Sequence, residues 1–255
     1  MAMQFQRLPL SIMKSKFSAF FLIVSLCTVG FSHAQSVDAL LADEAAIRNW
    51  QAGKTVNAES VSAFCEKSCF VAKPIPDAVF RLMQGKSFPA NATIKRDDLR
   101  YLQVLHYDAK GKIILGELVT NKAISRDVLD VLKVLYEARY PIERMVLIDR
   151  YGADDERSMT ANNSSAFNFR FVAGTRKLSN HSTGRAVDIN PLYNPFVVGK
   201  TVSPAAGRAY ADRSKDFVYK INADDLCVRE FKKRGFEWGG DWETRKDYQH
   251  FEKKN

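Results

Sequence analysis

The sequence has few of the residues that build disulfide-rich or multi-metal proteins. Its 255 residues include 4 cysteines, 4 histidines and 8 prolines, with no internal repeat or low-complexity tract. No second pair of cysteines accompanies Cys65 and Cys69, which argues against a zinc ribbon. After residue 31, no apolar run approaches the roughly 20 residues that a membrane-spanning helix needs. The chain has 46% hydrophobic residues, enough for a folded core.

Residues 1–34 are typical of a secretory signal peptide. A stretch without acidic residues precedes a mostly apolar run over 17–31, and small residues precede a cut expected ahead of Gln35. A membrane anchor is the weaker alternative, because the run is short. A lipoprotein at Cys27 is disfavoured by the bulky Leu26. We therefore expect an exported protein of the periplasm or cell envelope, with no stable membrane insertion after cleavage. The positive residues of the leader are Arg7, Lys14 and Lys16.

Net charge indicates the kind of surrounding that the mature chain meets. Loss of the three leader cations from a formal charge of +9 leaves +6. This excess favours an anionic environment such as a cell-wall polymer or acidic peptide termini. Nucleic acid is a poor alternative, because the cations are spread rather than striped and the leader predicts export. We expect a monomer.

The mature chain divides at about residue 98. Residues 35–97 are expected to form a helical extension packed on a domain over 98–255. Within the extension, Cys65 and Cys69 are candidates for a local disulfide, with two free buried thiols as the alternative. Cys227 lies in a helical pattern and is expected to be a core residue.

The periodicity of the domain predicts an α+β fold. β-rich residues on both sides of a polar, glycine-containing turn predict a hairpin over 99–107 and 112–119. Helical spacing predicts helices over 125–138 and 224–234, and short strands are expected at 145–148 and 185–190. Residues 149–170 are polar and lack periodicity. A solvated surface loop is one interpretation, but we favour a functional segment because it leads into the motif described next.

Two segments carry potential metal ligands. His181 and Asp188 lie seven positions apart around a glycine, and Asp247-Tyr248-Gln249-His250-Phe251-Glu252 follows near the end of the sequence. His181, Asp188 and His250 can supply three ligands to one Zn²⁺ ion, which leaves a fourth position for water. Asp247 is the candidate general base. In an extended segment, Asp247 and His250 would face opposite ways, so both can serve the site only if the chain bends at residues 248–249.

Further polar residues could complete the site. Arg170 ends the polar segment and is our candidate for stabilising an oxyanion or holding a substrate carboxylate, with Arg176 and Arg185 as rivals. Ser179 could form a hydrogen bond that orients His181, or it could serve as a turn residue.

The pattern Ser-x-His-x-x-Gly-x-Ala-x-Asp, present at 179–188, resembles the zinc peptidases of bacterial cell walls. These include VanY-type D-alanyl-D-alanine carboxypeptidases, VanX-type dipeptidases and phage L-alanyl-D-glutamate endolysins. Residues 239–242, residues 163–170 and Asp247-x-x-His250 resemble the endolysin-like branch, in which the base is an aspartate. The resemblance covers roughly the last 140 residues. It implies a small antiparallel sheet with flanking helices, as in the hedgehog signalling domain, with the same three ligands and Asp247 as base.

The resemblance implies hydrolysis of peptidoglycan stem peptides. We favour a D-alanyl-D-alanine carboxypeptidase, with an endopeptidase of the L-Ala–D-Glu type as the alternative. A non-catalytic wall-binding module with a structural zinc ion is the competing class, and hydrolysis of free dipeptides is a weaker possibility. Asp247 distinguishes the classes, because a closed structural site needs no base.

Overall fold

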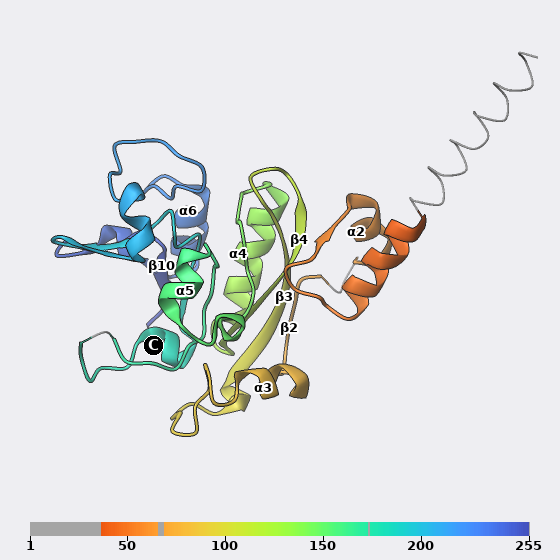
Figure 1. Cartoon of the computed structure of the whole chain (residues 1–255), viewed down its shortest axis with the longest axis horizontal. Coiled ribbons are helices and arrows are strands. Elements are labelled where there is room, and N and C mark those ends of the chain that lie inside the picture. The colour runs from red at the N-terminus through yellow and green to blue at the C-terminus, as the bar shows by residue number, and fades with distance from the viewer. Residues whose placement is uncertain (1–36, 66–68, 173, 255) are drawn as a thin grey trace, which may run out of the picture. The chain divides into compact units, whose positions relative to one another are not determined.

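The computed structural model describes residues 37–65, 69–172 and 174–254, so the leader peptide predicted over 1–34 lies outside the described residues. The described residues divide into two units at the boundary between Ala45 and Ala46. Residues 37–48 are helical, close to the helix expected there. Everything below concerns the second unit (Figure 1). Among the described residues, no helix has the length and apolar character needed to cross a membrane.

The largest sheet is antiparallel, with strand order β1-β4-β3-β2. Its centre is the predicted hairpin, formed by β3 (Leu99–Tyr107) and β4 (Ile113–Asn121), which pair along their full length. Two strands from the preceding region complete the sheet, because β1 (Thr55–Val56) pairs with β4 and β2 (Val71–Lys73) pairs with β3. Part of the region expected as a helical extension therefore contributes strands to the hairpin's sheet.

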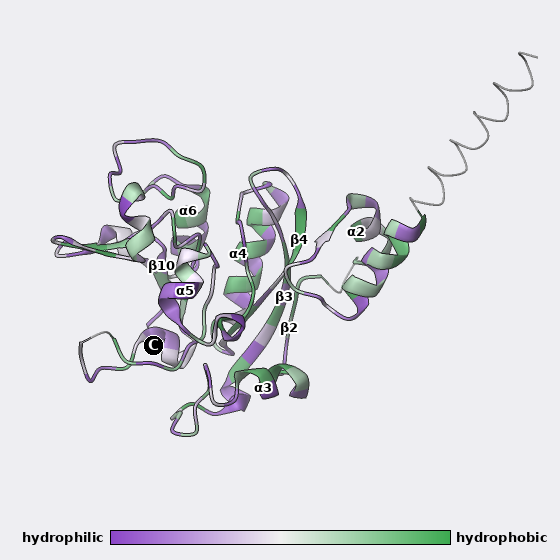
Figure 2. Ribbon diagram, in the orientation of Figure 1, coloured by the Kyte–Doolittle hydropathy of each residue, from purple (hydrophilic) through white to green (hydrophobic). Residues whose placement is uncertain are grey.

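Helix α4 (Ser125–Glu137) packs against this sheet and confirms the predicted helix. Figure 2 shows hydrophobic residues along β3, β4 and α4. α4 also contacts α6 (Leu226–Lys233), which carries Cys227 into the core as expected. One buried cluster joins these elements to two strand residues next to the candidate ligands, Val187 and Phe251. The metal motif is therefore anchored in the main core.

Two small antiparallel sheets carry the candidate site. One has the order β5-β10-β8, formed by β5 (Ala186–Asp188), β10 (His250–Glu252) and β8 (Glu237–Trp238). The other has the order β7-β6-β9, formed by β7 (Thr201–Ser203), β6 (Phe196–Val198) and β9 (Lys246–Asp247). Helices together with small antiparallel sheets confirm the predicted α+β class.

Short helices lie between the strands along the chain. The α-helices are α2 (Ala58–Phe64), α3 (Asp77–Met83) and α5 (Asp155–Thr160). The 3₁₀ helices are η1 (Arg96–Asp98), η2 (Ile148–Tyr151), η3 (Asn180–Thr183), η4 (Ala205–Tyr210) and η5 (Gly239–Asp241). Cys65 and Cys69 are joined by a disulfide, with Cα atoms 5.1 Å apart.

The strand predicted at 145–148 is wrong. The segment is buried, but its hydrogen bonds are irregular: the Met145 carbonyl accepts from the Glu117 N–H, whereas the Val146 N–H donates to the Asn163 side chain. A side chain therefore takes the place of a partner strand. Asn163 belongs to the polar segment 149–170, whose buried polar residues are partnered inside the protein rather than solvated as in a surface loop. They include Ser158, Asn162, Asn163, Ser164 and Asn168.

Candidate metal centre

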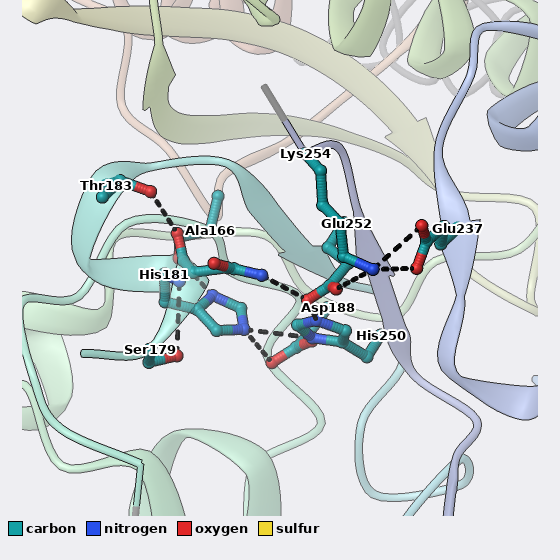
Figure 3. A network of polar contacts seen from close by, with 10 residues as sticks. Ala166, Ser179, His181, Thr183, Asp188, Glu237, His250, Glu252 and Lys254 are labelled. Carbon is teal, nitrogen blue, oxygen red and sulfur yellow. Dashed lines mark hydrogen bonds and ion pairs between the residues drawn. The ribbon is translucent and has the colours of Figure 1, made fainter. Parts of the chain in front are cut away.

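Three elements bring the predicted ligands together. His181 comes from η3, Asp188 from β5 and His250 from β10, and all three are buried. Their ligand atoms lie within 4.8 Å of one another. His181 Nε2 is 3.2 Å from Asp188 Oδ2, His250 Nδ1 is 3.0 Å from Asp188 Oδ1, and the two nitrogens are 3.3 Å apart. Figure 3 shows both imidazoles facing the carboxylate.

Strand alternation explains why Asp188 and His250 meet. β5 and β10 are antiparallel, with Asp188 opposite His250 and Val187 opposite Phe251. Directly opposed residues of an antiparallel pair have Cβ atoms about 5 Å apart and share a face. The other face carries Val187 and Phe251 into the core. The same pairing thus builds the core and the candidate site.

A tight 3₁₀ turn places His181. The Ser179 hydroxyl caps η3 by accepting from the His181 N–H at 3.3 Å, so it orders the main chain rather than the imidazole. Gly184 then ends the turn with a left-handed φ of 67°, and a Cβ there would lie 2.6 Å from the Asn121 nitrogen. Only glycine fits this approach. The glycine between the histidine and the aspartate is therefore required by packing as well as by torsion.

Hydrogen bonds on the far sides of the rings orient both histidines. His181 Nδ1 lies 2.5 Å from the Ala166 carbonyl, so its Nε2 is directed to Asp188. His250 Nε2 lies 3.0 Å from Glu252 Oε2, so its Nδ1 is the nitrogen that faces Asp188. Sequence reasoning missed both partners. Glu252 could have been found, because it shares a strand face with His250, but a main-chain carbonyl carries no residue-type signal.

The donor set fits a zinc ion. Zinc–nitrogen and zinc–oxygen bonds of about 2.0–2.1 Å place tetrahedral ligands about 3.3 Å apart. The two histidine nitrogens are 3.3 Å apart, which matches that edge length, and each lies 3.2 or 3.0 Å from a different oxygen of Asp188. Two imidazoles and one carboxylate are also a ligand set that catalytic zinc sites use, with one coordination position left open. The residues present therefore fit the metal that the sequence predicts.

The carboxylates of Asp188 and Glu252 favour a positive charge between the three candidate ligands. Burial alone would raise the pKa of Asp188, but the two histidines outweigh it and hold that pKa well below its usual range. Burial also works against a charged His250, yet the hydrogen bonds that its ring donates to Asp188 and Glu252 raise the pKa of His250 to about 10. The pKa of Glu252 falls to about 2, because His250 outweighs the effect of burial. A cation at the centre of these groups is stabilised.

Asp247 lies beside the cluster. It ends β9, and the turn at residues 248–249 separates it from His250 in β10, which confirms the predicted bend. Its Oδ1 atom is buried and has no hydrogen-bond partner among the described residues. Burial raises the pKa of Asp247 to about 7, with Asp188 adding to the rise and the two histidines opposing it. The structure thus holds an unpartnered carboxyl oxygen close to the three ligands.

Arg170 is engaged by a carboxylate outside the ligand set. Its Nε forms an ion pair with Asp155 of α5. Its main chain bonds to two residues around His181: the Arg170 carbonyl accepts from the Ser179 N–H at 3.0 Å, and the Arg170 N–H donates to the Ser182 hydroxyl at 2.8 Å. The rivals are less enclosed, since Arg176 is exposed, and Arg185 is half-buried like Arg170. A role for Arg170 in binding an oxyanion stays a prediction.

A family model described as D-alanyl-D-alanine carboxypeptidase matches residues 173–253. The matched segment contains His181, Asp188, Asp247 and His250. No curated protein and no solved structure gives a significant match. The family match confirms the resemblance predicted from the sequence and, with the His–Asp–His group, supports a metallopeptidase.

Proposed function

We propose that this protein is an exported zinc peptidase that removes the terminal D-alanine from peptidoglycan stem peptides. The observation that carries the proposal is the geometry of the cluster. Two histidine nitrogens and the carboxylate of Asp188 converge with ligand atoms within 4.8 Å of one another, and Asp247 presents a buried oxygen without a partner among the described residues beside them. A purely structural site would have no use for that carboxyl group.

The chain's own residues have separable roles in such a reaction. His181, Asp188 and His250 would hold the ion, which when bound would polarise the scissile carbonyl and lower the pKa of water to about 7. Asp247 would accept a proton from the attacking water and return it to the leaving amine.

The family match, the predicted leader and the net charge support this substrate assignment. The matching family is described by cleavage of D-alanyl-D-alanine. The predicted leader would deliver the chain to the compartment where the cell wall lies. The excess of positive charge favours a substrate that carries carboxylates, as the end of a stem peptide does.

Purified muropeptides of defined length provide the test. The mature chain is loaded with zinc, incubated with pentapeptide and tetrapeptide substrates, and the products are identified by mass spectrometry. Loss of one alanine from the pentapeptide alone supports the proposal. Asp247→Ala should keep the zinc and lose turnover, and full activity in this variant would contradict the role of Asp247 as base.

Other products would assign the site differently. Release of the intact peptide after its first alanine would identify an endopeptidase of the L-Ala–D-Glu type. Bound zinc without cleavage of any muropeptide would favour the non-catalytic wall-binding module.

A further inference from the structure

Glu252 is a buried carboxylate outside the ligand-and-base set. It is 8% exposed and lies on the face of β10 that also carries His250. Across the sheet, Glu252 is opposite Ala186, whose small side chain leaves room for it. A buried carboxylate is costly unless its oxygens are paired, so its position calls for partners of matching charge or polarity.

Two of its partners belong to the ligand-bearing segments. Glu252 Oε2 lies 3.0 Å from His250 Nε2 and accepts a 2.5 Å hydrogen bond from Asn180 Nδ2. Asn180 directly precedes His181 in η3. One carboxylate oxygen therefore connects the ring of the third ligand to the segment that carries the first (Figure 3).

The other oxygen of Glu252 faces an exposed ion pair rather than a ligand-bearing segment. Lys254 Nζ is 4.0 Å from Glu252 Oε1 and pairs more closely with Glu237, at 2.8 Å. Lys254 and Glu237 are exposed, so their contribution is screened by solvent. The exposed pair offers a matched control, because it has similar chemistry but does not touch a ligand.

We propose that Glu252 is a positioning residue that fixes the ring orientation of His250 and the spacing between the His181 and His250 segments before a metal ion binds. This inference rests on the proposed zinc site. Because Glu252 accepts the proton on His250 Nε2, Nδ1 is the ring nitrogen that faces Asp188 and the ligand position. Because Asn180 donates to the same oxygen, the two segments cannot separate without breaking a partly buried hydrogen bond.

Zinc affinity measured by competition with a chromogenic chelator tests the proposal without reference to activity. Outer partners of metal-bound histidines typically change affinity by about 10- to 100-fold. We expect Glu252→Leu, which keeps volume but no acceptor, to weaken zinc binding by that amount. Glu252→Gln keeps an acceptor for His250 and should recover most of the loss. Glu237→Gln should bind zinc like the wild type.

A double variant tests whether Asn180 acts through Glu252. Asn180→Ala should weaken zinc binding by less than Glu252→Leu, and the combination should be no weaker than Glu252→Leu alone. Long-range ¹H–¹⁵N correlation spectra of the metal-free protein should show a proton held on His250 Nε2, and in Glu252→Leu that proton should be distributed between the two ring nitrogens. A purely structural role would not change that signature.

The outcomes separate this inference from the function on which it rests. A wild-type chain that binds no zinc overturns both. Wild-type zinc binding with unchanged affinity in Glu252→Leu, or an equal loss in Glu237→Gln, overturns the inference alone. Should Glu252→Leu fail to fold, Asn180→Ala at its half-buried position decides, since wild-type affinity there also overturns the link.

Discussion

Gly239 offers a way to displace the candidate base without touching it. This glycine begins η5, and a Cβ added there would lie 2.5 Å from the Asp247 carbonyl oxygen and 2.7 Å from Asp247 Cβ. Its φ lies outside the left-handed region, so space rather than torsion excludes a side chain. Gly239→Ala therefore perturbs one defined neighbour.

The required displacement sets the expected effect. Ordinary contacts of a Cβ begin at 3.4 Å, so the Asp247 carbonyl oxygen must move by about 0.9 Å. A misplacement of about 1 Å in a reacting group can cost about 100-fold in rate, which corresponds to about 3 kcal/mol in the activation barrier. The ligands come from η3, β5 and β10, so zinc affinity should change little.

Steady-state kinetics on a pentapeptide, combined with zinc titration, test this expectation. We expect kcat to fall about 100-fold in Gly239→Ala while zinc affinity stays within about threefold of the wild type. Asp241→Asn is the control, because it alters an exposed ion pair with Lys232 in the same turn and should leave kcat unchanged. Wild-type kcat in Gly239→Ala would refute the reasoning, as would a loss of zinc binding equal to the loss of rate.

Four other perturbations should have distinct outcomes. Removal of metal by a chelator should abolish peptidase activity, and added zinc should restore it; Asp247→Ala should lower kcat by about 10²- to 10⁴-fold at unchanged zinc content. Arg213 donates to three carbonyls and to the Asn194 side chain, so we expect Arg213→Ala to lower the free energy of unfolding by about 2–3 kcal/mol in urea denaturation. Burial lowers the pKa of His106 to about 4. Unfolding exposes the ring at its ordinary pKa of about 6.5, so the unfolded state binds the extra proton and stability should fall by about 3 kcal/mol between pH 6.5 and 4. His106→Gln, measured by urea denaturation across this range, should show a smaller fall, and an unchanged fall would contradict the assignment.

Local patterns predicted the elements that are defined by their own residues. The hairpin over β3 and β4 follows from two β-rich runs around a polar turn, and α4 follows from helical spacing. The segment at 145–148 could not be distinguished from a strand by its sequence. Its residues are as buried as those of a core strand, and only the hydrogen-bond partner of its main chain is different. That partner is the side chain of Asn163, a long-range contact without periodicity.

The candidate site was predictable where residue type carries the chemistry. Histidine and aspartate spacing indicated His181, Asp188 and His250, and the structure places their ligand atoms within 4.8 Å. The hydrogen bond from His181 to the Ala166 carbonyl was not predictable, because any residue supplies a carbonyl. The ion pair between Arg170 and Asp155 was not predictable either. It depends on the position of α5 next to Arg170, and no residue spacing in the sequence indicates that position.

The alternation of faces along β5 and β10 limits how this protein can change in evolution. Each strand carries a ligand on one face and a core residue on the other, as Asp188 and Val187 do in β5. A single inserted or deleted residue in either strand would exchange the faces, exposing the core residue to the site and burying the ligand in the core. The loops between the strands can vary in length. Within β5 and β10, however, only substitutions are tolerated, so the residue spacing inside each strand must be conserved together with the site.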